Sequence, residues 1–124
     1  FCLERINNLK MITEKNSSKP TFVFMHHPPF ETLKCPDPFQ FQDNENMLRL
    51  RIELSRVKNL KYIFCGHVHR FESGCVETIP VSCVPSIATD LRWGKYSFHQ
   101  KDRPLYQLHK FHSDHGVLSQ TKLV

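Results

Sequence analysis

Three histidines follow short apolar runs, where their imidazoles could bind a metal ion. His26 comes directly after the run Thr21–Met25, and His67 and His69 follow a second run that ends at Cys65. Neutral imidazole is the commonest metal ligand among the side chains that titrate near neutral pH. The three residues are therefore candidate ligands, provided that the fold closes the 41-residue separation (67 − 26) between His26 and His67.

Two predicted strands and a connecting helix would bring these histidines together. β-branched and aromatic residues predict a buried strand over Thr21–Met25 and a second short strand over Lys61–Cys65. Apolar residues at helical spacing predict a helix over about residues 43–58. One crossover helix can connect two neighbouring parallel strands, and sites in such sheets form outside the carboxyl ends of the strands. We therefore expect the three histidines at one edge of a sheet.

The spacing of His67 and His69 leaves two geometries open. If the chain is extended there, both side chains share one face of the strand. If it turns, as Gly66 allows, both side chains can still reach one metal centre. H-x-H alone is weak evidence, but G-H-x-H after one apolar strand, with H-H-P-P after another, is more specific. Together the two motifs predict a metal site.

The second half of the chain is predicted to be mostly antiparallel. The stretch Phe71–Val84 predicts a hairpin around Gly74 or a pair of short strands, and residues 85–102 are predicted to be irregular. Leu105–Phe111 and Val117–Leu123 predict a further hairpin. The expected fold class is therefore α/β: strand, helix and strand in a mixed sheet, followed by antiparallel hairpins. A chain of 124 residues is long enough for one domain.

Composition and charge exclude some classes of partner. The net charge of +5 matches an anionic substrate in sign, but no basic run or nucleic-acid-binding motif indicates nucleic acid. No apolar run approaches the roughly 20 residues that cross a bilayer, so no membrane partner is expected. Five cysteines, an odd number without C-x-x-C spacing, predict a reduced protein and a cytoplasmic location. Cys65, Cys75 and Cys83 are expected to pack as small apolar side chains.

The two histidine motifs resemble two sequence blocks of the calcineurin-like metallophosphoesterase superfamily. Residues Phe24–Pro29 are similar to the fourth block of that superfamily, and residues Cys65–His69 are similar to the fifth. Residues Asp102–Tyr106, followed by the turn Asp114-His115-Gly116, look like the tail of the class III 3',5'-cyclic nucleotide phosphodiesterase branch. The resemblance implies that residues 1–124 form the C-terminal half of a catalytic domain, a β-sandwich flanked by helices.

The resemblance also implies a binuclear centre and a reaction. It implies two divalent metal ions, Fe, Mn or Zn, with His26 and His67 on the second ion and His69 on the first. His27 and Arg70 would support these ligands or contact the substrate, although Arg70 could equally pair with Glu72. Two metals can activate a bridging hydroxide and clamp the phosphoryl oxygens. The implied reaction is hydrolysis of a small phosphodiester, a 3',5'-cyclic nucleotide.

Three other blocks of the superfamily are absent from this sequence: Asp-x-His, Gly-Asp and Gly-Asn-His. The catalytic residues are therefore expected in an N-terminal half outside these 124 residues, and the chain alone is expected to be inactive or nearly so. One alternative is a catalytically inactive remnant or interaction module. Another is a zinc hydrolase in which three histidines and a water bind one ion. The oligomeric state is left open, although an exposed sheet edge would favour association.

Overall fold

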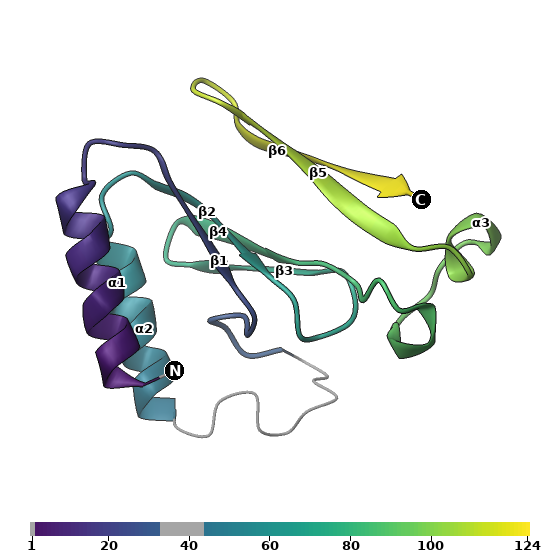
Figure 1. Ribbon diagram of the computed structural model, residues 1–124, viewed down its shortest axis with the longest axis horizontal. Helices are drawn as coiled ribbons and strands as arrows, with labels where there is room; N and C mark the ends of the chain where they lie inside the picture. The colour runs from purple at the N-terminus through teal and green to yellow at the C-terminus, as the bar shows by residue number, and fades with distance from the viewer. Residues whose placement is uncertain (1, 33–43) are drawn as a thin grey trace.

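The computed structural model describes residues 2–32 and 44–124 of the chain. Cys35, one of the five cysteines, and Asp43, at the start of the predicted helix over about residues 43–58, therefore lie outside the described residues. The described part is arranged in three layers, which are a pair of helices, a four-stranded sheet and a two-stranded sheet (Figure 1).

The four-stranded sheet forms the middle layer, and its strand order is β1-β2-β4-β3. Its strands in chain order are β1 (Thr21–Met25), β2 (Leu60–Cys65), β3 (Glu72–Val76) and β4 (Ile79–Cys83). The pairs β1–β2 and β2–β4 are parallel, whereas β3–β4 is antiparallel. The prediction of an α/β fold with a mixed sheet is confirmed, and the predicted bounds of β1 match the structure residue for residue.

Helices α1 (Leu3–Lys15) and α2 (Asn44–Arg56) cover one face of this sheet (Figure 1). The buried residues of α2 recur at helical spacing: Met47, Leu50 and Leu54. Leu50 and Leu54 join Ile6 of α1 and residues of the sheet in one core. After α2 ends, Asn59 takes a left-handed conformation with a φ of 60° and turns the chain into β2. The helix thus provides the crossover that makes β1 and β2 parallel.

Of the two predictions for Phe71–Val84, the pair of short strands is confirmed, and a hairpin around Gly74 is wrong, because the turn between β3 and β4 lies at Glu77. Glu77 has a φ of 52°, and Gly74 lies inside β3 opposite Val81. Gly74 is needed there because the ring of Phe30 packs against it. A Cβ at position 74 would lie 2.9 Å from Cδ1 of Phe30, which is buried in the core. Glycine permits this close approach because it has no side chain.

A hairpin of β5 (Leu105–His112) and β6 (Gly116–Leu123) forms the third layer, on the other face of the sheet (Figure 1). Every end of these two strands lies within one residue of its predicted position. Between β4 and β5 the chain forms two short helices, η1 (Thr89–Leu91) and α3 (Phe98–Lys101), in the stretch predicted to be irregular. The guanidinium of Arg92 holds this stretch together by donating hydrogen bonds to three backbone carbonyls: those of Ser86, Gln100 and Arg103.

Two of the three cysteines predicted to be buried are in the core. Cys65 and Cys83 are buried partners on neighbouring parallel strands. A hydrogen bond with the Cys83 thiol, together with burial, raises the pKa of Cys65, so that this thiol stays protonated and unreactive. The prediction for Cys75 is wrong, because β3 is an edge strand and Cys75 lies on its exposed side. None of the described helices has the length and apolar character that a membrane span requires.

We expect Gly74→Ala to destabilise the chain by about 1–3 kcal/mol, because the added methyl group would overpack a buried ring. Urea unfolding would measure the change in the free energy of unfolding. Cys75→Ser is the matched control, since Cys75 is adjacent but exposed, and its effect should stay within about 0.5 kcal/mol. Equal stability of Gly74→Ala and the unaltered chain would contradict the packing of Phe30 on Gly74.

Candidate metal centre

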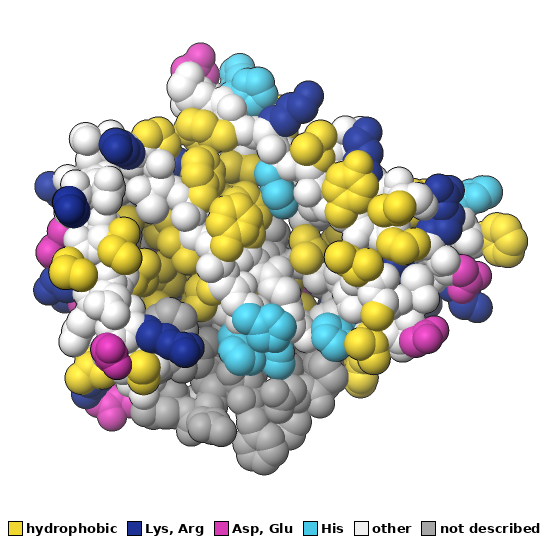
Figure 2. Space-filling model, viewed as in Figure 1, with side chains coloured by type: hydrophobic (Ala, Val, Ile, Leu, Met, Phe, Trp, Pro, Cys, Tyr) yellow, Lys and Arg dark blue, Asp and Glu magenta, His cyan; other side chains and the backbone are white. Residues whose placement is uncertain are grey.

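Three imidazoles meet where strands β1 and β2 end. His26 and His27 directly follow β1, and His67 lies two residues after β2. Met25 and Cys65, the last residues of the two strands, are partners in the parallel register, so the two strand ends are adjacent. One ring nitrogen from each of the three histidines lies within 4.8 Å of the other two. Figure 2 shows a group of histidine side chains exposed on the surface in this view.

The spacing of the ring nitrogens suits a shared cation. Nδ1 of His67 and Nε2 of His26 are 3.3 Å apart. A tetrahedral zinc ion with metal–nitrogen distances of about 2.0–2.1 Å holds its ligand atoms roughly 3.3–3.4 Å apart. The rings meet edge to face, with interplanar angles of 71° to 74°. A divalent ion therefore fits between His26 and His67, with His27 close enough to be a third ligand after a small adjustment.

The H-H-P-P segment is fixed by its two prolines. Pro28 and Pro29 are fully buried, whereas His26 is exposed and His27 half-buried. Arg51 of α2 donates a hydrogen bond to the carbonyl of Pro29 at 3.1 Å, which ties this loop to the helix layer. Since proline restricts the backbone to one φ value, the loop has little freedom. The buried prolines thus hold the two imidazoles at the surface.

The G-H-V-H loop turns sharply, which decides between the two geometries that the sequence left open. The N–H of Val68 donates to the carbonyl of Gly66 at 2.8 Å, closing a three-residue turn around His67. His67 and His69 have φ values of 66° and 54°, in the left-handed region. Val68 between them is fully buried and anchors the loop in the core. The N–H of Gly66 also donates to the carbonyl of His26 at 3.0 Å, so the two histidine loops are joined directly.

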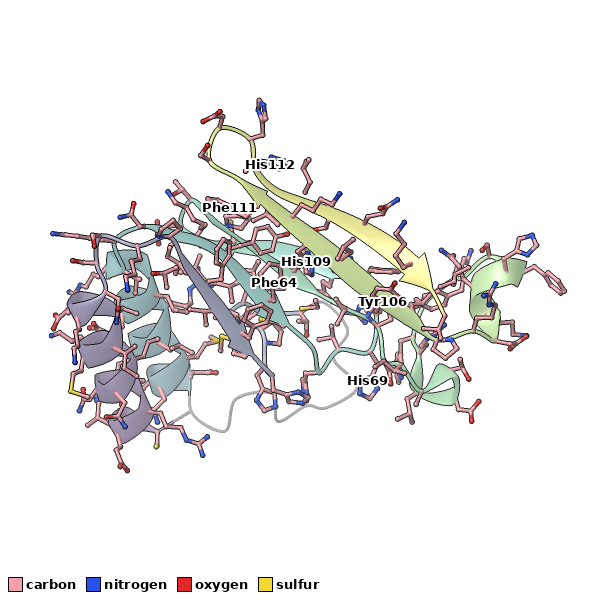
Figure 3. The ribbon with its side chains drawn as sticks, turned by 45° about the horizontal axis from the view of Figure 1, so that its top comes forward. Phe64, His69, Tyr106, His109, Phe111 and His112 are labelled. Atoms are coloured by element: carbon pink, nitrogen blue, oxygen red, sulfur yellow. The ribbon has the colours of Figure 1, made fainter. Side chains whose placement is uncertain are left out.

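The structure places His69 outside the group of three imidazoles. His69 is half-buried, lies on the loop after β2, and is labelled in Figure 3. Its carbonyl accepts a hydrogen bond from the N–H of Trp93 at 3.0 Å, which ties the loop to the stretch after β4. Of the predicted ligands, the fold brings His26 and His67 together. It adds His27, which was expected to support the ligands or to contact the substrate.

Arg70 forms an ion pair with Glu72. Its Nε and a terminal nitrogen lie 2.8 Å and 2.6 Å from the same carboxylate oxygen. The side chains of Arg70 and Glu72 are only 17% and 16% exposed, so this pair is screened less than a surface pair. Of the two roles considered for Arg70, the structure shows the pairing with Glu72.

His109 of β5 belongs to the packing between the two sheets. Its ring lies 4.2 Å from that of Phe64, centroid to centroid, and its Nδ1 is 2.7 Å from the hydroxyl oxygen of Ser119 (Figure 3). Partial burial lowers the pKa of His109. These contacts give His109 a structural role.

Comparisons with known proteins show that the chain is similar in sequence to phosphodiesterases. No protein-family model matches the chain. Among curated proteins, the glycerophosphodiester phosphodiesterase GpdQ of Enterobacter lignolyticus is 30% identical over 91 residues, which are 73% of this chain and 30% of the relative. The probable cyclic nucleotide phosphodiesterase RPA0124 of Rhodopseudomonas palustris is 31% identical over 70 residues, 56% of this chain and 24% of the relative. The probable glycerophosphodiester phosphodiesterase GpdQ of Arcobacter nitrofigilis is 26% identical across 98% of this chain and 45% of the relative.

The chain is related to phosphodiesterases of the metallophosphoesterase family. The resemblance predicted from the two histidine motifs is therefore confirmed. The chain spans less than half of the length of the curated relatives that it matches.

We expect the chain to bind one Zn²⁺ through the three grouped imidazoles. His26→Ala and His67→Ala should each weaken the affinity by more than about 10-fold, because each removes one of the converging nitrogens. His69→Ala should change the affinity by less than about twofold, since His69 lies outside the group and an independent site contributes little coupling. Titration against a chelating dye would measure the three affinities.

His112→Ala is the matched control for that titration, because His112 is an exposed histidine at the far end of β5. It should leave the zinc affinity unchanged. Equal losses for His67→Ala and His69→Ala would contradict the grouping of His67 with His26 and His27.

Proposed function

We propose that this chain is part of a metal-dependent phosphodiesterase. The observation that carries the proposal is the convergence of the ring nitrogens of His26, His27 and His67 at two adjacent strand ends. The names of the curated relatives support the reaction class, since each is a phosphodiesterase. We further propose that residues 1–124 are the C-terminal portion of a longer catalytic domain and that the protein acts in the cytoplasm.

The donor set favours particular metals. Imidazole suits Zn, Fe and Cu, whereas Mn prefers carboxylates. Three imidazoles leave further coordination positions of one ion open to water and substrate. For the centre of two divalent ions, Fe, Mn or Zn, that the resemblance implies, His69 would be a ligand of the other ion. The remaining ligands of that ion would come from groups outside the described residues.

The residues of this chain hold the ligand nitrogens in position and leave the site open to a substrate. A bound divalent ion would supply a Lewis acid for phosphoryl oxygens and lower the pKa of a coordinated water. His26 is exposed, so a substrate can approach from its side. Burial of Pro28 and Val68 holds the loops on either side, and a fixed loop keeps the ligand nitrogens in place without reorganisation.

Arg70 and His27 were both considered as residues that support the ligands or contact the substrate. The ion pair with Glu72 occupies the guanidinium of Arg70 and supports a positioning role, in which Arg70 fixes the start of β3 after the G-H-V-H loop. The membership of His27 in the group of three supports a role as a metal ligand. A contact of His27 with the phosphate would then depend on a shift of its ring.

The proposed substrate is a small phosphodiester, with a 3',5'-cyclic nucleotide as the first candidate. One relative is named as a probable cyclic nucleotide phosphodiesterase, which supports it. A glycerophosphodiester is the second candidate, because two relatives carry that substrate in their names. Both are diesters of one phosphate, so the same site chemistry serves either of them.

In the full-length polypeptide that contains this chain, we expect hydrolysis of a phosphodiester that depends on added Mn²⁺ or Zn²⁺. His67→Ala should lower kcat/KM by more than about 10-fold, because it removes a metal ligand. Parallel assays with cyclic AMP and glycerophosphocholine would separate the two substrate candidates. The control is His112→Ala, which should keep full activity.

Zinc binding by the grouped histidines without turnover of either diester, in the full-length polypeptide and with excess metal, would contradict the proposal. That result would favour the catalytically inactive remnant or interaction module. Full activity of His67→Ala would contradict the assignment of the site.

A further inference from the structure

The stretch that follows β4 is bonded to the G-H-V-H loop at two points. Just before the loop, the N–H of Val84 donates to the carbonyl of Cys65 at 3.1 Å. At the end of the loop, the N–H of Trp93 donates to the carbonyl of His69 at 3.0 Å. Figure 3 shows His69 beside this stretch. Residues 84–93 therefore border the loop that carries two of the predicted metal ligands.

Arg92 fixes the shape of this stretch. The centre of its guanidinium lies 5.5 Å from the centroid of the Tyr96 ring. The guanidinium also donates hydrogen bonds at 2.8, 2.8 and 2.6 Å to the carbonyls of Ser86, Gln100 and Arg103. These bonds tie the start of the stretch to the residues that lead into β5. A surface held in this way loses little conformational entropy when it binds a ligand.

Three large apolar side chains of residues 84–93 are exposed. Ile87 is 68% exposed, Leu91 52% and Trp93 48%. Ile87 also lines a hollow that His26 and Gly66 line as well. Figure 2 shows exposed hydrophobic side chains next to histidines on this face. A group of exposed apolar side chains beside a candidate metal centre is typical of a surface that binds a ligand.

We propose that Trp93 and Ile87 bind the nucleobase of the substrate, with the indole of Trp93 stacked on the base. The inference rests on the proposed function, and it favours the cyclic nucleotide over the glycerophosphodiester. An aromatic side chain that stacks on a base strengthens binding by roughly 5- to 150-fold. The hydroxyls of a glycerol group would instead lose water on this surface without gaining hydrogen bonds from apolar side chains.

The position of the two side chains suits the dimensions of a nucleotide. One ribose separates the phosphate of a nucleotide from its base, so a base-binding surface has to begin next to the metal centre. Trp93 meets this condition because its backbone is bonded to that of His69, two residues after the grouped ligand His67. Ile87 meets it because it shares a hollow with His26. Both side chains therefore begin beside residues of the candidate centre.

The fluorescence of Trp93 provides the test, because Trp93 is the only tryptophan of the chain. The zinc-loaded 124-residue chain would be titrated with 5'-AMP, ribose 5-phosphate and phosphocholine. AMP should quench the emission by about half or more, because its base stacks on the indole. Ribose 5-phosphate lacks the base and phosphocholine lacks an aromatic ring, so each should quench the emission by less than about a tenth.

Three variants that keep the fluorophore locate the ligand. Ile87→Ser should weaken the binding of AMP by about threefold or more, because it removes an apolar contact. His67→Ala should weaken it by more than about 10-fold, because it removes a ligand of the ion that holds the phosphate. Phe98→Ser is the matched control, since Phe98 is 88% exposed but lies on α3, outside residues 84–93, and it should leave the affinity for AMP unchanged.

Kinetics of the full-length polypeptide separate a binding role of Trp93 from a structural one. Trp93→Ala should lower kcat/KM for cyclic AMP, relative to kcat/KM for glycerophosphocholine, by at least about fivefold. The loss should fall on KM, because stacking on the base is the same in the ground state and the transition state. Trp93→Phe should restore most of the loss, since phenylalanine keeps an aromatic face.

Quenching by ribose 5-phosphate or phosphocholine as strong as that by AMP would overturn the proposal, as would no quenching by AMP. Equal effects of Ile87→Ser and Phe98→Ser on the affinity for AMP would overturn it, and so would equal losses of Trp93→Ala with the two diesters. The proposed function fails separately, if neither diester is hydrolysed. In that case the titration with AMP alone decides the present inference.

Discussion

Strand β1 runs parallel to β2, and their register places Met25 beside Cys65. Because each strand is followed at once by a histidine motif, this pairing brings together side chains that lie 41 residues apart in the chain. Helix α2 makes the pairing possible, since its apolar stripe packs on the sheet while it carries the chain back to the start of β2. The group of three imidazoles needs both the H-H-P-P and the G-H-V-H segments, and the crossover is what brings these segments together.

Apolar anchors then hold the polar rings in place. Val68 is buried between two histidines that both adopt left-handed backbone conformations, which are unfavourable for residues other than glycine. Burial of a valine side chain contributes about 1.5–3 kcal/mol, which offsets part of the strain of about 1–3 kcal/mol at each of the two histidines. Pro28 and Pro29 anchor the other loop in the same way. Strain at this loop is consistent with a functional role, because strained backbone clusters at functional sites.

The sequence predicted features that depend on local pattern, and missed those that depend on distant contacts. Residue types predicted β1, the β5–β6 hairpin and the histidines near a sheet edge. The prediction of a turn at Gly74 failed because this glycine is required by the ring of Phe30, which packs against it from 44 residues away (74 − 30). No local sequence pattern reveals such a contact. The exposure of Cys75 depends on strand order, which places β3 at an edge. The turn that separates His69 from the other imidazoles depends on the burial of Val68, again a tertiary effect.

X-ray absorption at the zinc edge of the zinc-loaded chain reports the atoms bound to the metal. We expect about three imidazole nitrogens at roughly 2.0–2.1 Å from the zinc, and one fewer in His67→Ala. A first shell of oxygens without the outer-ring scattering of imidazole would contradict the claim that His26, His27 and His67 form the metal centre.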